Sequence, residues 1–286
     1  SGMFRGCSSL TGIPLPSSFS TASVTDMSYM LAGSNVSYQV INTFDTSSLV
    51  NASHMFEGWQ GTVLDLTGWN VRKVENMESM FENSNLKQLK TEGWNTSRLL
   101  PVKNMFKGCS SLLSTSTFVL DVSKVQDMSS MFYGCSGLGE MDLSHFRNDI
   151  VTNVDNMFYG CTSLYRLDIR NLDTRYASTA GTFNDCCDMQ HLTVGSGFQL
   201  ASVEAFSLTF RNFGTEYHER YHGRTAIDCP SAHWDNVFSI ALKNAYSDWE
   251  DRFYCYQKAV LPSGYDFNRT ARYLAGNQLD RINKIE

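Results

Sequence analysis

The sequence predicts an α/β solenoid, a right-handed stack of rungs in which each repeat of roughly 26 residues supplies one short helix and one short strand. Three observations lead to this prediction. A Met-Phe motif recurs with a nearly fixed period, an apolar pattern of helical spacing leads into each copy, and an alternating apolar–polar pattern follows it. A fixed period of this length is typical of solenoids, in which each repeat is one supersecondary unit.

Eight copies of the motif follow one another at nearly equal intervals. They are MFRGC at 3–7, MLAGS at 30–34, MFEGW at 55–59, MFENS at 80–84, MFKGC at 105–109, MFYGC at 131–135, MFYGC at 157–161 and TFNDC at 182–186. We therefore expect a repeat solenoid over residues 1–197, with about eight rungs and a beginning in mid-repeat. Residues 198–286 are expected to form a C-terminal cap and a helical tail.

The first half of each repeat is predicted to be a short helix. Val125, Met128, Met131 and Phe132 have the spacing i, i+3, i+6, i+7, which places apolar side chains on one helical face. Methionine at these positions suits core packing, because its flexible side chain fills irregular gaps. A glycine follows Met-Phe by two residues in most copies, as at Gly134, and a left-handed glycine there can end a helix.

The second half of each repeat is predicted to be a strand, as in LDLTGW at 64–69, MDLSHF at 141–146 and LDIRNL at 167–172. Alternation with a period of two places one set of side chains in the core and the other in solvent. The expected inward residues are Leu64, Leu66, Met141, Leu143, Leu167 and Ile169. The expected outward residues are Asp65, Lys90, Asp142 and Asp168. A second core column is expected from Trp69, Trp94, Phe146 and Leu172.

These repeats resemble a known family, the bacterial-surface-protein repeat of roughly 26 residues, a relative of the leucine-rich repeats in BspA-like proteins. The resemblance rests on VENMESMFENSNLKQL, VQDMSSMFYGCSGLGEMDLSHF and VDNMFYGCTSLYRLDIRNLDT and covers residues 1 to about 197. It implies a leucine-rich-repeat-like stack, a bacterial cell surface and a role as an adhesin or protein-binding scaffold rather than an enzyme. The segment LLSTSTFVL at 112–120 departs from the pattern, because a regular strand is expected there.

Four cysteines, Cys109, Cys135, Cys161 and Cys186, share one repeat position. Equivalent side chains in neighbouring rungs point in parallel, about 4.8 Å apart, so their sulfur atoms do not turn toward one another. We expect a column of buried thiols. One thiol per rung also does not supply the four ligands of a tetrahedral zinc site. Whether Cys229 and Cys255 form a disulfide is left open.

The segment after the repeats is expected to cap the stack. Residues 229–256 carry apolar side chains at helical spacing, among them Trp234, Phe238 and Leu242, and resemble the helix that follows the last rung in other leucine-rich-repeat surface proteins. Residues 269–286 are a second candidate helix.

One motif suggests catalysis. His218, Glu219 and His222 fit H-E-x-x-H, in which two histidines one helical turn apart hold zinc and the glutamate acts as general base. The intervening Arg220 and Tyr221 are polar or bulky, and Gly214 and Gly223 leave room for barely two helical turns. We therefore expect a solvated loop or short helix, with no metal, no cofactor and no catalytic residue.

The overall charge narrows the possible partners. A net charge of −6 without a Lys/Arg run argues against nucleic acid and anionic membrane. No apolar run approaches the roughly 18 residues that a membrane span requires. We expect an extracellular or cell-surface scaffold that binds a protein or glycan on another cell or in the matrix, with its signal and anchor outside this sequence.

The candidate binding surface is the outer face of the strands. Its residues are Asp65, Lys90, Glu140, Asp142, Arg166 and Asp168, with Gln88 and His191 as neighbours. A merely solvated face is an alternative interpretation of this row. Two other functions remain open: a zinc-dependent hydrolase that uses HERYH, and a receptor-binding or structural part of a phage tail or fibre.

Overall fold

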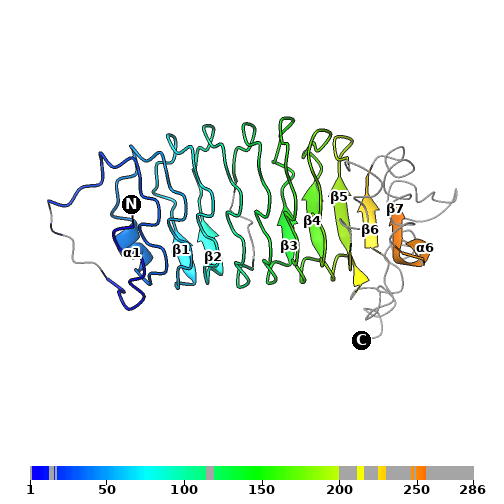
Figure 1. Ribbon diagram of the computed structural model, residues 1–286, viewed down its shortest axis with the longest axis horizontal. Coiled ribbons are helices and arrows are strands. Elements are labelled where there is room, and N and C mark those ends of the chain that lie inside the picture. Colours follow the sequence, from blue (N-terminus) through cyan, green and yellow to red (C-terminus); the bar gives the residue numbers. More distant parts are fainter. Residues whose placement is uncertain are drawn as a thin grey trace, which may run out of the picture.

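The computed structural model describes residues 2–12, 16, 18–113, 119–199, 211–215, 225–229, 246–247 and 249–255. The chain forms an elongated parallel β-solenoid, with successive rungs stacked along its long axis (Figure 1). The described elements are α1 (Tyr38–Ile41), β1 (Val63–Asp65), β2 (Gln88–Lys90), β3 (Glu140–Asp142), β4 (Arg166–Ile169), β5 (His191–Val194), β6 (Thr225–Asp228), α6 (Trp249–Arg252) and β7 (Phe253–Cys255). The predicted solenoid is thus confirmed.

The strands form two parallel sheets along one wall of the stack. One sheet pairs β1 with β2, and the other has the order β3-β4-β5-β6-β7. The rung that contains residues 105–120 lies between the sheets, and of its irregular segment residues 114–118 fall outside the described part. The second sheet continues through β6 and β7, which lie beyond Gly197, so the predicted end of the repeats does not coincide with the end of the sheet.

The Met-Phe half of each rung is a run of turns, so the prediction of a short helix there is wrong. The residue before Met-Phe has a positive φ, as in His54 (55°), Asn104 (56°) and Asn156 (56°). A left-handed residue interrupts the regular right-handed backbone on which an α-helix depends. The apolar spacing is still explained, because Val125, Met128, Met131 and Phe132 are fully buried on the inner side of these turns.

Backbone N–H groups in this half alternate between two kinds of partner. Ser130, Phe132 and Gly134 donate to carbonyl groups of the next rung, at N···O distances of 2.8, 2.9 and 2.7 Å. The intervening Met131 and Tyr133 donate to the carbonyl three residues earlier in their own rung, at 3.2 and 3.1 Å. The turns therefore satisfy their own backbone and also bind the neighbouring rung, as a strand does.

Asp and Asn side chains fix the corners of the rungs. In one rung Asp121, Asp127 and Asp142 each accept the backbone N–H two residues later, at 3.0, 2.9 and 2.8 Å. Such Asx turns hold a chain reversal with a short polar side chain. The same bond recurs in other rungs at Asp26, Asp45, Asn51, Asp65, Asn70, Asn76, Asn95, Asn148, Asn153, Asp168 and Asp173.

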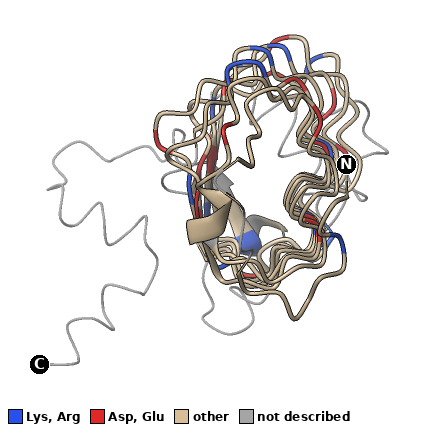
Figure 2. Cartoon of the chain, turned by 90° about the vertical axis from the view of Figure 1, so that its left-hand side faces the viewer, with Lys and Arg blue, Asp and Glu red and all other residues tan. Residues whose placement is uncertain are grey.

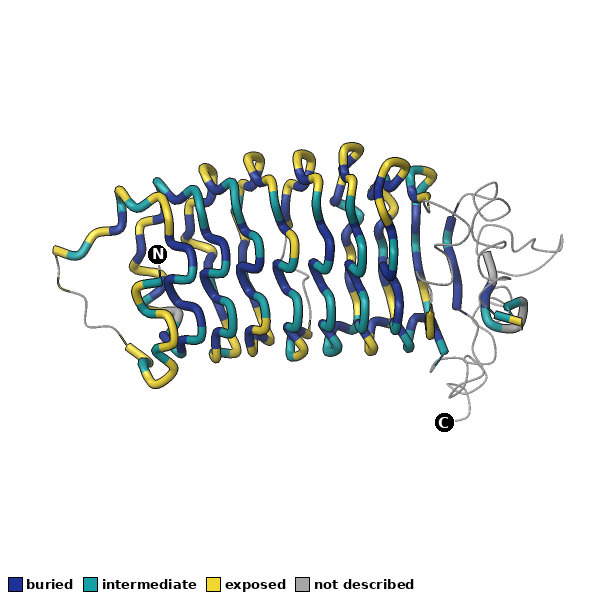
Figure 3. Tube along the Cα trace, in the orientation of Figure 1, coloured by how far each residue is buried: buried dark blue, intermediate teal, exposed yellow. Residues whose placement is uncertain are grey.

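The core lies between the two walls, where buried segments of successive rungs lie side by side (Figure 3), and its side chains form columns along the stack. Phe rings of neighbouring rungs stack nearly parallel, and the Phe106 and Phe132 centroids are 5.5 Å apart with an interplanar angle of 1°. Phe213 and Phe253 extend this column into the rungs of β6 and β7. All six side chains predicted to point inward are buried: Leu64, Leu66, Met141, Leu143, Leu167 and Ile169. In the second column Trp69, Phe146 and Leu172 are buried and Trp94 is partly buried.

The predicted thiol column is confirmed. Cys109, Cys135, Cys161 and Cys186 are free thiols and fully buried. Each Sγ donates to a Phe carbonyl of the preceding rung, at 2.9 Å for Cys109 and 3.1 Å for the others. Burial raises the pKa of the Cys109 thiol to about 11 and that of Cys161 to about 12.

The predicted helical cap falls mostly outside the described residues. Within residues 229–256 the structure describes α6 and β7, and residues 269–286 are not described. Among the described residues, no helix is long and apolar enough to cross a membrane.

The left-handed glycines yield a test of the turn backbone. Gly134 has a φ of 69°, and an added Cβ would lie 3.8 Å from the Gly108 Cα, so Gly134→Ala meets conformational strain without a clash. We expect Gly134→Ala to lower the free energy of unfolding by about 1 kcal/mol. Gly134→Asn should cost less, because Asn83 adopts the same conformation in its rung. Thermal melting measures both variants.

The matched control is Gly68→Ala, where an added Cβ meets open space and φ is outside the left-handed region. That change should leave the melting temperature nearly unchanged. Equal melting temperatures for Gly134→Ala and Gly68→Ala would contradict the assigned turn geometry.

The thiol column predicts a pattern of chemical modification. Iodoacetamide at pH 8 should alkylate Cys7, which is partly exposed, well before the buried Cys109, Cys135, Cys161 and Cys186. Burial denies the reagent access and keeps these thiols protonated, whereas the thiolate is the reactive form. Mass spectrometry of peptides from the native and urea-unfolded chain measures the order. Equal rates at Cys7 and Cys135 in the native chain would show that the column is open to solvent.

Candidate functional site

The predicted outer-face residues lie side by side on neighbouring strands. Asp65 of β1 is in register with Lys90 of β2, and the Lys90 Nζ is 3.5 Å from the Asp65 Oδ2. Burial acts to raise the pKa of Asp65, but hydrogen bonds from Thr67 and the charge of Lys90 together hold it below its ordinary value. This pair is a partly buried ion pair at the first of the two sheets.

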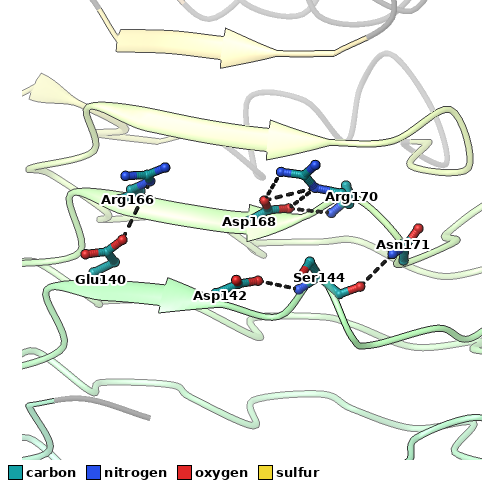
Figure 4. A network of polar contacts seen from close by, with 7 residues as sticks. All are labelled: Glu140, Asp142, Ser144, Arg166, Asp168, Arg170 and Asn171. Carbon is teal, nitrogen blue, oxygen red and sulfur yellow. Dashed lines mark hydrogen bonds and ion pairs between the residues drawn. The ribbon is translucent and has the colours of Figure 1, made fainter. Parts of the chain in front are cut away.

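The second sheet brings together the other four predicted residues (Figure 4). Glu140 is in register with Arg166, and the Arg166 Nε is 3.6 Å from the Glu140 Oε1. Both side chains are more than half exposed, and Tyr165 donates its hydroxyl to Glu140 at 3.3 Å. An ion pair that is this exposed contributes little to the stability of the fold, so its side chains are available to contact a partner.

Asp142 and Asp168 are also in register, one strand apart, but each has a structural task. Asp142 accepts the Ser144 N–H at 2.8 Å, and hydrogen bonds from Ser144 lower the pKa of Asp142. Asp168 accepts the Arg170 N–H at 3.1 Å, and its carboxylate also binds the Arg170 guanidinium, which raises the pKa of Arg170. These two carboxylates thus stabilise the turns that follow β3 and β4.

A shallow groove of about 240 Å³ crosses the outer face of β4, β5 and β6. Its lining residues are Arg166, His191, Leu192, Thr193, Ala226 and Asp228. The groove forms because the outward side chains of β3 and β4 are long, whereas those of Thr193 in β5 and Ala226 in β6 are short. Burial and the nearby Arg166 lower the pKa of His191, so this imidazole is neutral at pH 7.

The sequence prediction did not include Thr193, Ala226 or Asp228. The β6 rung lacks a Met-Phe pair at the repeat period, so its strand could not be aligned with the others. The available signal was the pair Ile227 and Asp228, in which Ile227 has the place of the inward leucine and pairs with Leu192 of β5.

No metal site is formed by the part of the chain that the structure describes, since no cluster there has three His, Cys, Asp or Glu side chains that could hold an ion. His218, Glu219 and His222 of the HERYH motif lie outside the described residues. The interpretation of that segment therefore stays a prediction.

Comparison with known proteins gives one match. A family model described as "Mycoplasma protein of unknown function, DUF285" matches residues 1–118, 84–195 and 115–216 in three overlapping regions. This family is related to the BspA-like repeat proteins. No curated protein and no solved structure matches the chain. Because the matches together cover residues 1–216 of the 286, the chain belongs to this family of repeat proteins.

Proposed function

We propose that the chain is an extracellular or cell-surface scaffold that mediates adhesion by binding a protein or glycan on another cell or in the matrix. The observation that carries the proposal is the register of the outer strand face. Side chains one repeat apart in the sequence become neighbours on adjacent strands, so each of the two sheets has a continuous outer face of mixed charge. Solenoids generally bind partners through such extended faces.

The face has the properties that recognition of a polar partner requires. Its ion pair Glu140–Arg166 is exposed, and partner groups can compete for it at little cost in stability, whereas Asp65–Lys90 is partly buried. The groove beside them places Arg166 and His191 along one row and Asp228 along the next. Backbone hydrogen bonds between rungs hold these rows at fixed spacing, so little conformational entropy is lost on binding.

The finer family assignment, to BspA-like surface proteins, is part of this proposal, as is a helical cap at the end of the stack. A role within a larger fibre or tail assembly is compatible with the same surface. In that case the partner would be a receptor of the assembly.

An exchange of charges between Glu140 and Arg166 tests the binding face. In the variant Glu140→Arg/Arg166→Glu the ion pair is kept and neither residue holds an Asx turn, so the melting temperature should be unchanged. Binding to immobilised extracellular-matrix proteins or to a glycan array should weaken by about tenfold or more, because the partner meets inverted charges. Surface plasmon resonance on the strongest binder of the panel measures the change.

The matched control exchanges another ion pair, Glu82→Lys/Lys107→Glu, whose atoms are 3.2 Å apart in the Met-Phe half of the rungs. This variant should bind like the unchanged chain. If both exchanges leave binding intact, the strand face is only solvated and the proposal fails for this surface.

The proposal includes no catalytic role for HERYH, and zinc content tests that part. Protein purified without chelator or metal-affinity resin should contain far less than one zinc per chain by plasma mass spectrometry. Arg220 and Tyr221, between the histidines, do not suit the buried helix on which a working motif sits. Stoichiometric zinc that is lost in His222→Ala would instead establish a metal site and favour the hydrolase.

A further inference from the structure

A row of cations follows the edge of the stack where the chain leaves the strands. We call it the basic ridge, and it consists of Arg72, Lys73, Arg98, Lys124, Arg147 and Arg175. All six residues are exposed, and they come from five successive rungs. Figure 2, which looks along the stack, shows Lys and Arg gathered in the loops at this edge, and Figure 3 shows the same loops as exposed.

Asx turns hold the ridge loops in the same conformation from rung to rung. Asn70, Asp121 and Asp173 accept the N–H groups of Arg72, Ser123 and Arg175, at 3.3, 3.0 and 3.0 Å. Backbone pairing between rungs sets the step from one loop to the next at about 4.8 Å, and the stacked Phe rings below, with centroids 5.2 to 5.9 Å apart, follow the same repeat. Lys73, Arg98, Lys124 and Arg175 therefore share one repeat position along the solenoid axis. Arg72 directly precedes Lys73, and Arg147 lies just before the Asx turn that Asn148 forms in its own rung.

The ridge has more cations than carboxylates, although the chain as a whole has a net charge of −6. The carboxylates in the same loops are Glu75, Glu92, Asp121, Asp149 and Asp173. Asp121 and Asp173 are directed toward the backbone of their own turns, and two cations are paired, Arg98 with Glu75 and Arg175 with Asp173. Arg72, Lys73, Lys124 and Arg147 form no ion pair within the described part of the chain.

We propose that the basic ridge binds a linear anionic polysaccharide, with its carboxylate or sulfate groups against successive rungs. The step between rungs is close to the length of one pyranose unit in an extended chain. Ser97 and Ser123 are exposed and directly precede Arg98 and Lys124, so their hydroxyl oxygens can accept hydrogen bonds from sugar hydroxyls. At one end Tyr176 is 78% exposed and offers a ring for stacking against a sugar. This surface is distinct from the strand face and does not depend on its function.

The geometry favours a glycan over nucleic acid. Binding of single-stranded nucleic acid uses successive aromatic side chains on which bases stack, and among the described ridge loops only Tyr176 is aromatic and strongly exposed. A line of loop tips also supplies no helix or β-ribbon to enter a major groove.

The test uses a heparin-derived octasaccharide as the probe, with binding measured by isothermal titration calorimetry between about 50 and 200 mM salt. In the ridge variant Arg72, Lys73, Lys124 and Arg147 are all replaced by Ser. We expect its affinity to fall by about tenfold or more at the lower salt concentration, and the dependence of affinity on salt to become shallower. The four residues have no ion-pair partner to lose within the described chain, so the melting temperature should stay close to that of the unchanged chain.

The control variant replaces Arg5, Lys87, Lys103 and Lys107 by Ser, which changes the net charge equally but away from both the ridge and the candidate residues of the strand face. It should keep its affinity to within about threefold, since distant exposed charges are screened. Equal losses of affinity in the two variants would show that only the net charge matters and would contradict the proposal that the basic ridge is the binding site. Tighter binding of a DNA oligonucleotide or of anionic vesicles than of the octasaccharide would overturn the glycan assignment.

Discussion

The structure depends on one constraint: every rung must present its backbone hydrogen-bonding groups in register with those of the next rung. On the strand wall this is ordinary parallel pairing, as between β3 and β4. On the opposite wall, turns satisfy the same constraint. Every second N–H group there, such as that of Phe132 or Gly134, points along the solenoid axis toward the next rung. Because a turn can do this only with left-handed residues at two fixed places, the repeat needs residues that tolerate positive φ there.

Register along the backbone forces identical side chains into columns, and the core follows from this. A Phe in one rung packs on the Phe of the next, and a Cys at a fixed position meets the carbonyl of the previous Phe. Cys suits that place because it is small and apolar and still donates a weak hydrogen bond. In an earlier rung Ser34 occupies the same position, and its buried hydroxyl has no hydrogen-bond partner among the described residues.

The sequence predicted the period, the inward strand residues and the thiol column, because each depends on repetition alone. It did not distinguish a two-turn helix from a run of turns, since both bury Val125, Met128 and Met131 at the same spacing. A usable signal was the residue before Met-Phe, where Asn104, Asn156 and Gly181 are types that favour positive φ. The outer strand face was predicted in its positions, but the turn-holding role of Asp142 and Asp168 depends on backbone geometry that alternation does not reveal.

The arrangement of charges on this chain becomes apparent only when residues are compared by their position within the repeat. The absence of a Lys/Arg run argued against nucleic acid and anionic membrane, yet one or two cations in the corresponding loop of successive repeats come together in a row once the rungs stack. The stacking of rungs likewise brings Glu140 and Arg166, which lie one repeat apart in the sequence, close enough to form an ion pair. A rigid stack therefore displays two separate polar surfaces, the strand face and the basic ridge, at a fixed angle. The two surfaces share no residue, so a substitution on one can be tested without changing the other.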